Sequence, residues 1–334
     1  MSRDIIVIGA SAGGVEALQE LMRQLPRRFS AAVFVVCHIA PLGTSRMAEV
    51  LRTASALPVE FATNEEPIKL GEIRVAPPDR HLMLEDGHVI LTRGPKHNRA
   101  RPAIDPLFRS AATEHGRRVV GVVLTGLLDD GAAGLLAIKR QHGVAIVQDP
   151  KDARFPDMPK NALAATPVDY CVPLRAIGPL LVKLSEERSG GERATASRVL
   201  EIEAKADVGR SVNMDNLGKP SGYSCPECGG VLWEVDDPEL LRFRCRVGHS
   251  FSVEGLRTEH QQISEDALWA AVRALEESAN FSRRLAERCT TQDIRPAAEE
   301  YERRAARDQG HADEIASILN RRWTEGDGPV NERQ

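Results

Sequence analysis

The stretch that most constrains the fold of this chain is IIVIGASAGGVEAL, residues 5–18. A continuous run of isoleucine and valine leads into a glycine-rich turn, and apolar residues at helical spacing follow the turn. Uninterrupted apolar runs are typical of parallel strands that helices cover on both faces. A turn of this kind serves one of two chemistries: it holds a phosphate at the helix N-terminus, or it presents Ser11 as a nucleophile.

Strand and helix patterns alternate after this stretch. Asp86-Gly87, inside the apolar run LMLEDGHVIL, predicts a two-residue β-hairpin turn. Strands that alternate with helices indicate an α/β fold, so we expect a doubly wound, mostly parallel sheet over residues 1–187. The further predicted strands are 31–39, 119–125, 144–148 and 168–172, and the predicted helices are 15–25, 130–142, 159–166 and 174–187.

The composition changes after residue 187. Residues 188–222 are polar without a sustained apolar pattern, which predicts an exposed linker. Residues 223–255 hold a cysteine cluster and predict a zinc ribbon, and the apolar spacing in 256–322 predicts a helical hairpin before a tail at 323–334. The chain lacks both an apolar run of about 18 residues and a secretory signal pattern. Because clustered cysteines also suit a reducing compartment, we expect a cytoplasmic protein.

The opening turn departs from both nucleotide-binding patterns. A dinucleotide fold requires a glycine where Ser11 stands and an acidic residue after the second strand, where this chain has Cys37 and His38. A P-loop requires a lysine that the turn lacks. Residues 9–13 instead match G-x-S-x-G, a turn that exposes a serine hydroxyl and places helix N–H groups near a developing oxyanion. A glycine-rich turn with an incidental serine is the structural alternative.

A serine nucleophile requires a base, and the base requires a group that orients it. His38 follows the second predicted strand and Asp130 follows a later one. Both therefore lie with Ser11 at the carboxyl edge of a parallel sheet, where functional groups gather. Asp129 is an alternative third member, and structural roles for the histidine and the loop aspartate stay open at this point. The chain order Ser, His, Asp differs from that of the α/β-hydrolases.

Seven segments together resemble the catalytic domain of the chemotaxis protein-glutamate methylesterases, the CheB type. In that family's order they are IGASAGGVEAL, HIAP, APPDRHL, RPAIDPLFRSAA, LTGLLDDGAAGL, QDP and MPKNAL. The resemblance implies a doubly wound fold and hydrolysis of methyl-esterified glutamates on receptor signalling helices, in some members also deamidation of glutamine. It implies Ser11 as nucleophile, His38 as base and Asp130 as their carboxylate, with no cofactor for catalysis.

The sequence departs from the family's usual pattern near the site. Ala12 replaces a threonine, and Leu127-Leu128 replaces a Met-Gly pair before the aspartate. We expect N–H groups around Ala12, Gly13 and Leu127 to bind the oxyanion, and Arg101 is a weaker candidate for substrate contact, with structural pairing to nearby acids as the alternative. The chain starts at the first predicted strand, so a receiver domain and control by its phosphorylation are not expected.

The cysteine cluster predicts a metal site. CPECGG and RFRCRVGHSF supply a C-x2-C pair and a C-x3-H pair, separated by sixteen residues. Such pairs hold a tetrahedral zinc, here through Cys225, Cys228, Cys245 and His249, and reduced structural cysteines are the alternative. Four protein ligands leave no open coordination position, so we expect a structural zinc that holds only the ribbon. Chelation is then expected to spare esterase activity.

Two other functions compete with the esterase. The first is a catalytically weak signalling adaptor that binds partners through the ribbon and the helices. The second is nucleic-acid binding through Arg242, Arg244 and Arg246, which the net charge of −4 and the neighbouring acids oppose. We expect the helices to bind a methylated chemoreceptor or a similar helical protein, or a second copy of the chain. Neither nucleic-acid binding nor membrane insertion is expected.

Overall fold

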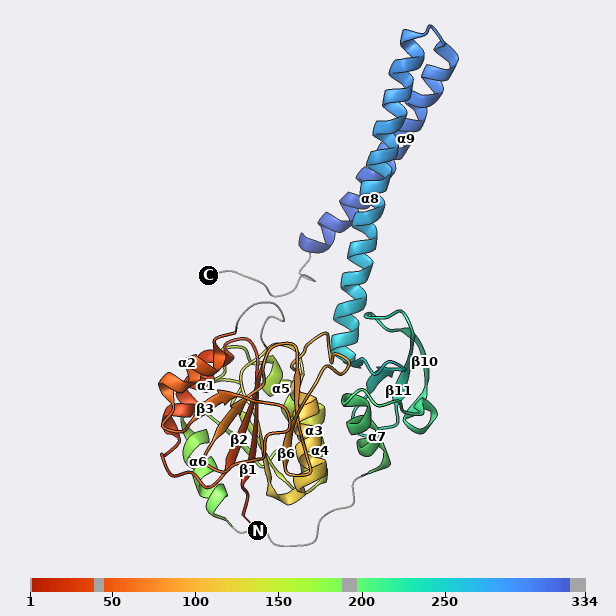
Figure 1. Cartoon of the computed structure of the whole chain (residues 1–334). Coiled ribbons are helices and arrows are strands. Elements are labelled where there is room, and N and C mark those ends of the chain that lie inside the picture. The colour runs from red at the N-terminus through yellow and green to blue at the C-terminus, as the bar shows by residue number, and fades with distance from the viewer. Residues whose placement is uncertain (1, 39–44, 188–196, 325–334) are drawn as a thin grey trace. The chain divides into compact units, whose positions relative to one another are not determined.

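The computed structural model describes residues 2–38, 45–187 and 197–324, and it divides into two compact units after Leu256. The first unit contains the large sheet, its helices and the cysteine cluster, and the second is built from two long helices (Figure 1). Of the sequence motifs above, residues 39–41 of HIAP lie outside the described residues.

The large sheet has seven strands in the order β3-β4-β2-β1-β7-β8-β9, and every neighbouring pair is parallel. Successive strands lie on both sides of β1, which confirms the doubly wound sheet. Strands after β1 are added first on one side of it and then on the other, so the topological switch point lies at β1, the strand that precedes Ser11. The strands are β1 Ile5–Ala10, β2 Ala32–Cys37, β3 Val59–Phe61, β4 Ile73–Val75, β7 Val119–Val123, β8 Val144–Gln148 and β9 Tyr170–Val172.

Helices cover both faces of this sheet because its central strands are apolar on both faces. Alternate residues of β1 enter different cores: Ile6 and Ile8 pack with α1, α2 and α6, and Ile5 and Val7 pack with α3, α4 and α5. The helices are α1 Gly14–Gln24, α2 Met47–Ala54, α3 Ile104–His115, α4 Ala132–Arg140, α5 Asp157–Ala165 and α6 Leu174–Glu186, with a 3-10 turn at Gly116–Arg118.

A two-stranded hairpin joins the second of these cores. Strands β5 (His81–Glu85) and β6 (His88–Thr92) are antiparallel, with Glu85 opposite His88. Asp86 and Gly87 both have positive φ, 49° and 74°, as a tight hairpin turn requires. The hairpin predicted from this dipeptide is confirmed.

The stretch predicted as a linker contains ordered elements beyond residue 196. Helix α7 (Arg198–Asp207) packs on α3, a 3-10 turn covers Met214–Asn216, and β10 spans Gly218–Ser224. The sequence pattern missed α7 because its buried face carries the charged residues Glu203 and Asp207. These acids pair with arginines that are distant in sequence.

The cysteine cluster belongs to a four-stranded antiparallel sheet in the order β10-β11-β12-β13. Its strands β11 (Val231–Val235), β12 (Arg242–Cys245) and β13 (Ser250–Ser252) follow β10. We call residues 218–252 the ribbon. Its apolar core is small. Five ribbon residues, Cys225, Leu232, Phe243, Cys245 and Phe251, pack together with Leu256, which follows the ribbon.

The second unit is an antiparallel pair of helices, α8 (Val253–Thr291), whose first residues belong to the first unit, and α9 (Arg295–Thr324). Their buried residues recur at spacings of seven, or of three and then four, which is the seven-residue repeat of a left-handed coiled coil. Many are alanines, which allow close approach of the two helices. None of the helices in the described residues is long and apolar enough to span a membrane. The buried residues with this spacing are Val272, Ala279, Ser282 and Ala286 on α8 and Ala298, Ala305, Asp308, Ala312 and Leu319 on α9.

Candidate active site

The three residues expected to act together follow three adjacent strands. Ser11 follows β1, His38 follows β2 and Asp130 lies in the loop after β7, and β1 pairs with both β2 and β7. Because these strands are parallel, their carboxyl ends meet at one edge of the sheet. The backbone fixes the first two ends, since the His38 N–H donates to the Ala10 carbonyl at 3.2 Å.

The side chains form one chain of hydrogen bonds. Ser11 Oγ lies 3.0 Å from His38 Nδ1, and His38 Nε2 lies 2.7 Å from Asp130 Oδ2. Both distances are within hydrogen-bonding range. The two ring nitrogens have exchanged the roles that they have in serine proteases, where Nε2 faces the serine and Nδ1 the aspartate. The order of groups needed to activate a hydroxyl is the same.

Asp130 is held at the N-terminus of α3. It is 4% exposed and accepts N–H groups from Ile104 at 2.7 Å and Asp105 at 3.1 Å. Burial raises its pKa, but the hydrogen bond and charge of His38 and the two N–H groups outweigh burial and lower the pKa to about 2. Asp130 therefore stays ionised and acts as an acceptor for His38.

Asp105 makes the reciprocal contact. Its Oδ1 accepts the N–H groups of Gly131 at 3.1 Å and Gly134 at 2.7 Å, in the first turn of α4. The N-terminus of α3 is thus capped by a carboxylate from the loop before α4, and the start of α4 is capped by a carboxyl group from α3. Burial and the nearby charge of Asp130 raise the pKa of Asp105 to about 7. The sequence gives no sign of this role, because both partners of Asp105 are backbone N–H groups.

Asp129, the alternative third member, faces a different partner. Its Oδ1 accepts a hydrogen bond from Ser252 Oγ at 2.8 Å, with Asn98 Nδ2 at 3.5 Å. Burial, followed by a smaller contribution from the Asp130 and Glu254 charges, raises its pKa to about 6 despite the Ser252 hydrogen bond. The structure brings Asp130, and not Asp129, to His38.

Thr125 organises the turn that carries Ser11. The Ser11 N–H donates to the Thr125 carbonyl at 3.0 Å, and Thr125 Oγ1 lies 3.1 Å from the carbonyl oxygen of Ala12. The same hydroxyl accepts the Phe155 N–H at 2.8 Å. Gly126 is required beside it, since a Cβ there would lie 2.0 Å from Met158 Sδ. In the sequence, Thr125 and Gly126 are marked only by LTGLLDDGAAGL, one of the seven segments that resemble the family.

The weaker site candidates lie around this turn, with one exception. Gly13 precedes α1 in a left-handed conformation with φ 68°, and Leu127 is 41% exposed. Leu128, which stands where the family's glycine is expected, also has a positive φ of 61°. The guanidinium of Arg101 instead contacts Asp79 at 2.6–2.8 Å and two backbone carbonyls. These contacts match the structural alternative for Arg101.

Residues 6–181, more than half of the chain, match the family model described as CheB methylesterase. The chain belongs to the CheB methylesterase family. Three relatives named protein-glutamate methylesterase/protein-glutamine glutaminase agree with this assignment. The one from Leptospira interrogans is 37% identical over 187 residues, which cover 56% of this chain and 97% of the relative.

Other relatives are longer than the matched region. The proteins from Anaeromyxobacter dehalogenans and Pyrococcus abyssi are 39% and 37% identical over 54% and 57% of this chain, and the matched region covers 53% of each. The catalytic domain of the Thermotoga maritima CheB methylesterase is similar in structure, with a TM-score of 0.53 and 34% identity over 55% of this chain and 100% of that domain. The sheet domain is therefore a methylesterase domain, a carboxylic ester hydrolase.

The family model ends before the cysteine cluster, which the structure brings together in this CheB methylesterase. Ligand atoms of Cys225, Cys228, Cys245 and His249 all lie within 4.8 Å of one another. The Cys228 and Cys245 sulfurs are 3.8 Å apart, and His249 Nδ1 is 3.5 Å from Cys245 Sγ and 3.7 Å from Cys225 Sγ. Around a tetrahedral zinc with usual bond lengths, two sulfurs are about 3.8 Å apart and a sulfur and a nitrogen about 3.5 Å. This group of three cysteines and one histidine could therefore hold a metal ion.

Proposed function

We propose that this chain hydrolyses the methyl esters of glutamate side chains in receptor-like helical signalling proteins, with Ser11 as nucleophile, His38 as base and Asp130 as the residue that orients it. The observation that carries the proposal is the continuous hydrogen-bond chain from Ser11 Oγ through both His38 nitrogens to Asp130. The names of the relatives support the substrate class, and they add glutamine deamidation as a second reaction of the same site.

The geometry supports a two-step acyl transfer. His38 Nδ1 takes the proton of Ser11 as Oγ attacks the ester carbonyl, and it then returns that proton to the departing methoxide, which leaves as methanol. Water repeats the sequence on the acyl-enzyme, releases the glutamate carboxylate and regenerates Ser11. Asp130, ionised because its pKa is about 2, keeps the Nε2–H directed away from the serine and stabilises the imidazolium.

The developing oxyanion requires hydrogen-bond donors near Ser11. The N–H of Ser11 itself is engaged by Thr125, so we assign this role to the backbone around Ala12 and Gly13, at the start of α1, and around Leu127. The positive end of the α1 dipole favours a negative charge at this position. No side chain is needed for such contacts, which is why Ala12 and Leu127 are compatible with activity.

Zinc is the metal that we propose for the ribbon, held by Cys225, Cys228, Cys245 and His249. It would supply cross-linking of the ribbon and no reaction step, because four protein ligands complete its usual coordination. Reduced thiol ligands of this kind require a reducing compartment, which supports action in the cytoplasm.

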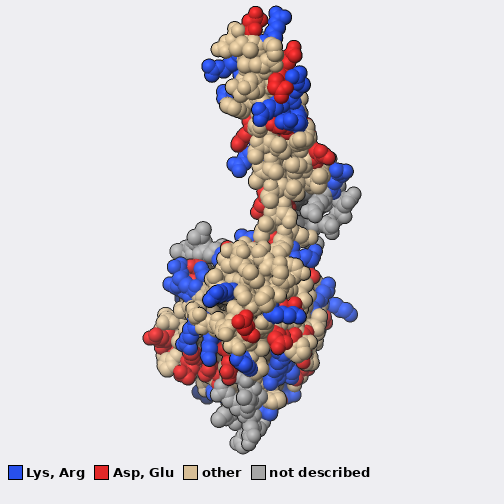
Figure 2. All heavy atoms as spheres, turned by 90° about the vertical axis from the view of Figure 1, so that its right-hand side faces the viewer, with Lys and Arg blue, Asp and Glu red and all other residues tan. Residues whose placement is uncertain are grey.

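The ribbon is not proposed to bind nucleic acid. Arg242 and Arg244, two of the three alternating arginines, are buried and paired with Glu203, Asp237 and Asp207. Basic and acidic side chains are interspersed on the face drawn in Figure 2, whereas nucleic-acid binding favours a patch of one sign. We assign partner binding to the coiled coil of α8 and α9, with a receptor helix bundle or a second copy of the chain as partner.

Ser11→Ala tests the proposed function. We expect turnover to fall by about 10⁴-fold or more, the loss typical of removing a serine nucleophile. The assay measures methanol release from a methylated receptor and ammonia release from the same receptor with glutamine at the methylation sites. Ser30→Ala, an exposed serine just before β2 at the opposite edge of the sheet, is the matched control. Equal turnover of the Ser11 variant and the wild type would exclude Ser11 as the nucleophile.

A further inference from the structure

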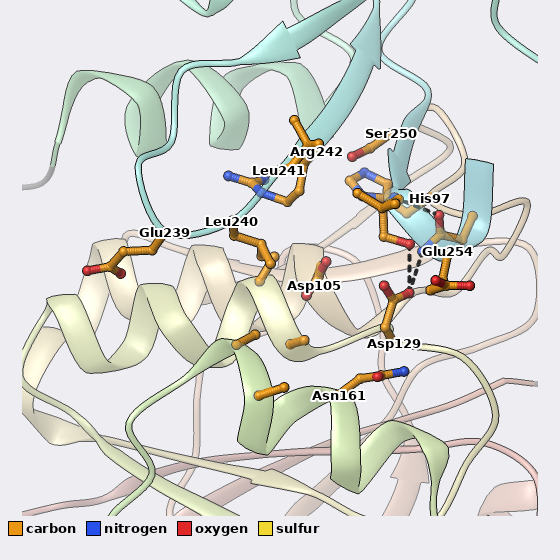
Figure 3. Close-up of a pocket in the computed structure, with 17 residues that line it drawn as sticks. His97, Asp105, Asp129, Asn161, Glu239, Leu240, Leu241, Arg242, Ser250 and Glu254 are labelled. Atoms are coloured by element: carbon orange, nitrogen blue, oxygen red, sulfur yellow. Dashed lines mark hydrogen bonds between the residues drawn. The ribbon is translucent and has the colours of Figure 1, made fainter. Parts of the chain in front are cut away.

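The ribbon contacts the loop that contains Asp130. Ser252, in β13, donates its hydroxyl to Asp129 at 2.8 Å, and its N–H donates to Asn98 Oδ1 at 3.1 Å. Asn98 Nδ2 approaches the same Asp129 oxygen at 3.5 Å. Asp129 directly precedes Asp130, and Figure 3 shows its side chain pointing from its loop toward the ribbon strands. One hydrogen bond, from Ser252 to Asp129, therefore connects β13 to the residue next to the proposed catalytic Asp130.

The same strand is joined directly to the metal site. His249, a proposed ligand, immediately precedes β13, and its carbonyl accepts the N–H of Cys245, another ligand, at 3.0 Å. The hairpin of β12 and β13 is therefore closed by two metal ligands. The position of Ser252, three residues after His249, depends on the conformation of this hairpin.

A second connection runs through buried charges. Arg244, beside Cys245 in β12, is fully buried and pairs with Asp207 of α7. Arg109 of α3 binds the same carboxylate at 2.9 Å and lies 3.8 Å from Asp105, which caps the helix after Asp130. Removing one partner from a buried ion pair leaves an uncompensated charge, so these contacts tie β12 to α3 strongly.

Packed side chains do not fill the space on the ribbon side of Asp129. A cavity of about 240 Å³ lies between the ribbon and helices α4 and α5, lined by Asp129, Ser252, Asn161 and Arg242 among others (Figure 3). In a close-packed interface the neighbouring side chains would fix the loop whatever its hydrogen bonds. Beside this cavity the Asp129 side chain is held by its hydrogen bonds from Ser252 and Asn98.

We propose that strand β13 positions the Asp129–Asp130 loop for catalysis, so that metal binding at the cysteine cluster controls the turnover of the active site. The inference rests on the proposed esterase function. It replaces the expectation that zinc holds only the ribbon and that chelation spares activity. Ser252 is a positioning residue in this scheme, because it acts through Asp129 and does not touch the substrate.

Loss of metal has a defined consequence. The ribbon core consists of six residues, two of them the ligands Cys225 and Cys245, and a core this small does not hold a fold without its metal. When the hairpin loosens, Ser252 releases Asp129, and Asp130 moves relative to His38. A displacement at this point slows proton transfer but leaves the surface around Ser11 that binds a small ester unchanged.

The first test uses three variants of the full-length protein and p-nitrophenyl acetate as substrate. Ser252→Ala removes the hydroxyl, and Ser252→Thr retains it. Ser250→Ala makes the same deletion on the same strand, at a hydroxyl that has no hydrogen bond to the described residues. We expect kcat of Ser252→Ala to fall about tenfold, within the range that a misplacement of about 1 Å produces, with unchanged KM. Ser252→Thr and Ser250→Ala should keep the wild-type kcat, and all three should keep their zinc.

The second test measures the loop without reference to catalysis. The N–H groups of Ile104 and Asp105 bond to Asp130, so their hydrogen exchange reports whether this carboxylate is in place. Removal of metal by a chelator should accelerate exchange at both amides and lower kcat, and added zinc should reverse both effects. The Ser11→Ala variant should show the same exchange changes, because it lacks the nucleophile but keeps the loop.

The outcomes separate the two proposals. One outcome is that turnover depends on Ser11 while neither kcat nor the hydrogen exchange of Ile104 and Asp105 changes on Ser252→Ala or on removal of metal. In that case the coupling is wrong and the proposed function stands. If the protein shows no Ser11-dependent hydrolysis, the proposed function fails, and the exchange measurement still decides the coupling. A fall in kcat for Ser250→Ala equal to that for Ser252→Ala would also overturn the positioning role.

Discussion

Asp105→Asn tests whether the carboxyl group beside Asp130 carries a proton in the folded protein. Asp105 is 14% exposed, and burial and the Asp130 charge raise its pKa from the ordinary value of 3.8 to about 7. The asparagine keeps an oxygen that accepts the N–H groups of Gly131 and Gly134, so it imitates the protonated acid. The variant removes the charge and leaves the capping hydrogen bonds.

The sign of the pH effect follows from the two pKa values. Between pH 4 and pH 7 the folded state holds a proton on Asp105 that the unfolded chain has lost, so the free energy of unfolding falls as the pH rises. Below this range Asp105 is protonated in both the folded and the unfolded state, so it does not lower the free energy of unfolding. A shift of about three pKa units corresponds to at most about 4 kcal/mol, fully developed above pH 7. We expect the free energy of unfolding of Asp105→Asn to lack this decline with pH.

Hydrogen exchange of β1 and β7 measures this difference. The tryptophans lie at positions 233, 269 and 323, outside the large sheet and its covering helices. The most protected amides of β1 and β7 report the unfolding of the sheet directly. Comparing wild type and variant at the same pH cancels the intrinsic exchange rate. Asp105→Ala is the second control: it leaves two helix N–H groups without this acceptor and should destabilise by about 2–3 kcal/mol at every pH. Parallel pH profiles of wild type and Asp105→Asn would refute a protonated Asp105.

Three further predictions concern the loop, the metal and the coiled coil. Leu128 is 40% exposed and has a positive φ of 61°. Leu128→Gly should relieve about 1 kcal/mol of backbone strain and raise the melting temperature, and Leu128→Val should lower it. A glycine variant less stable than the wild type would contradict the strain at this position. Cys228→Ser should abolish stoichiometric zinc in elemental analysis while Cys289→Ser, outside the cluster, keeps it; equal metal loss would remove Cys228 from the site. Ala279→Asp buries a charge at a fully buried position and should destabilise the helix pair by about 3 kcal/mol or more, whereas exposed Ala274→Asp should not; equal melting of the two variants would reject the predicted packing.

The parts of the fold that were predictable have strong local signals. The runs at β1, β2, β7 and β8 are apolar on both faces, and only a parallel sheet between two helix layers buries both. The strands β3 and β4 were not predicted, because three residues such as Val59–Phe61 or Ile73–Val75 are too short to show a period. They are identified by their pairing with β2, which no local pattern shows.

Helix α7 shows a different limit of sequence patterns. It lies in a stretch predicted as linker because two of its buried positions, Glu203 and Asp207, are acids. Their burial depends on Arg109, Arg242 and Arg244, which are distant in sequence and show no sign of pairing there. Apolar periodicity detects only cores made of apolar residues, so an interface built on ion pairs resembles an exposed segment.

The adjacent acids Asp129 and Asp130 show why the site was predictable in part. Strand order places Ser11, His38 and this pair at one edge of the sheet, but it does not decide which carboxylate faces the histidine. The decision comes from hydrogen-bond donors: two α3 N–H groups and His38 stabilise the Asp130 anion, whereas Asp129 has the ribbon hydroxyl of Ser252. Burial raises the pKa of both groups, and only at Asp130 do the donors outweigh it. The same residue chemistry therefore yields one carboxylate that faces His38 and one that contacts the ribbon.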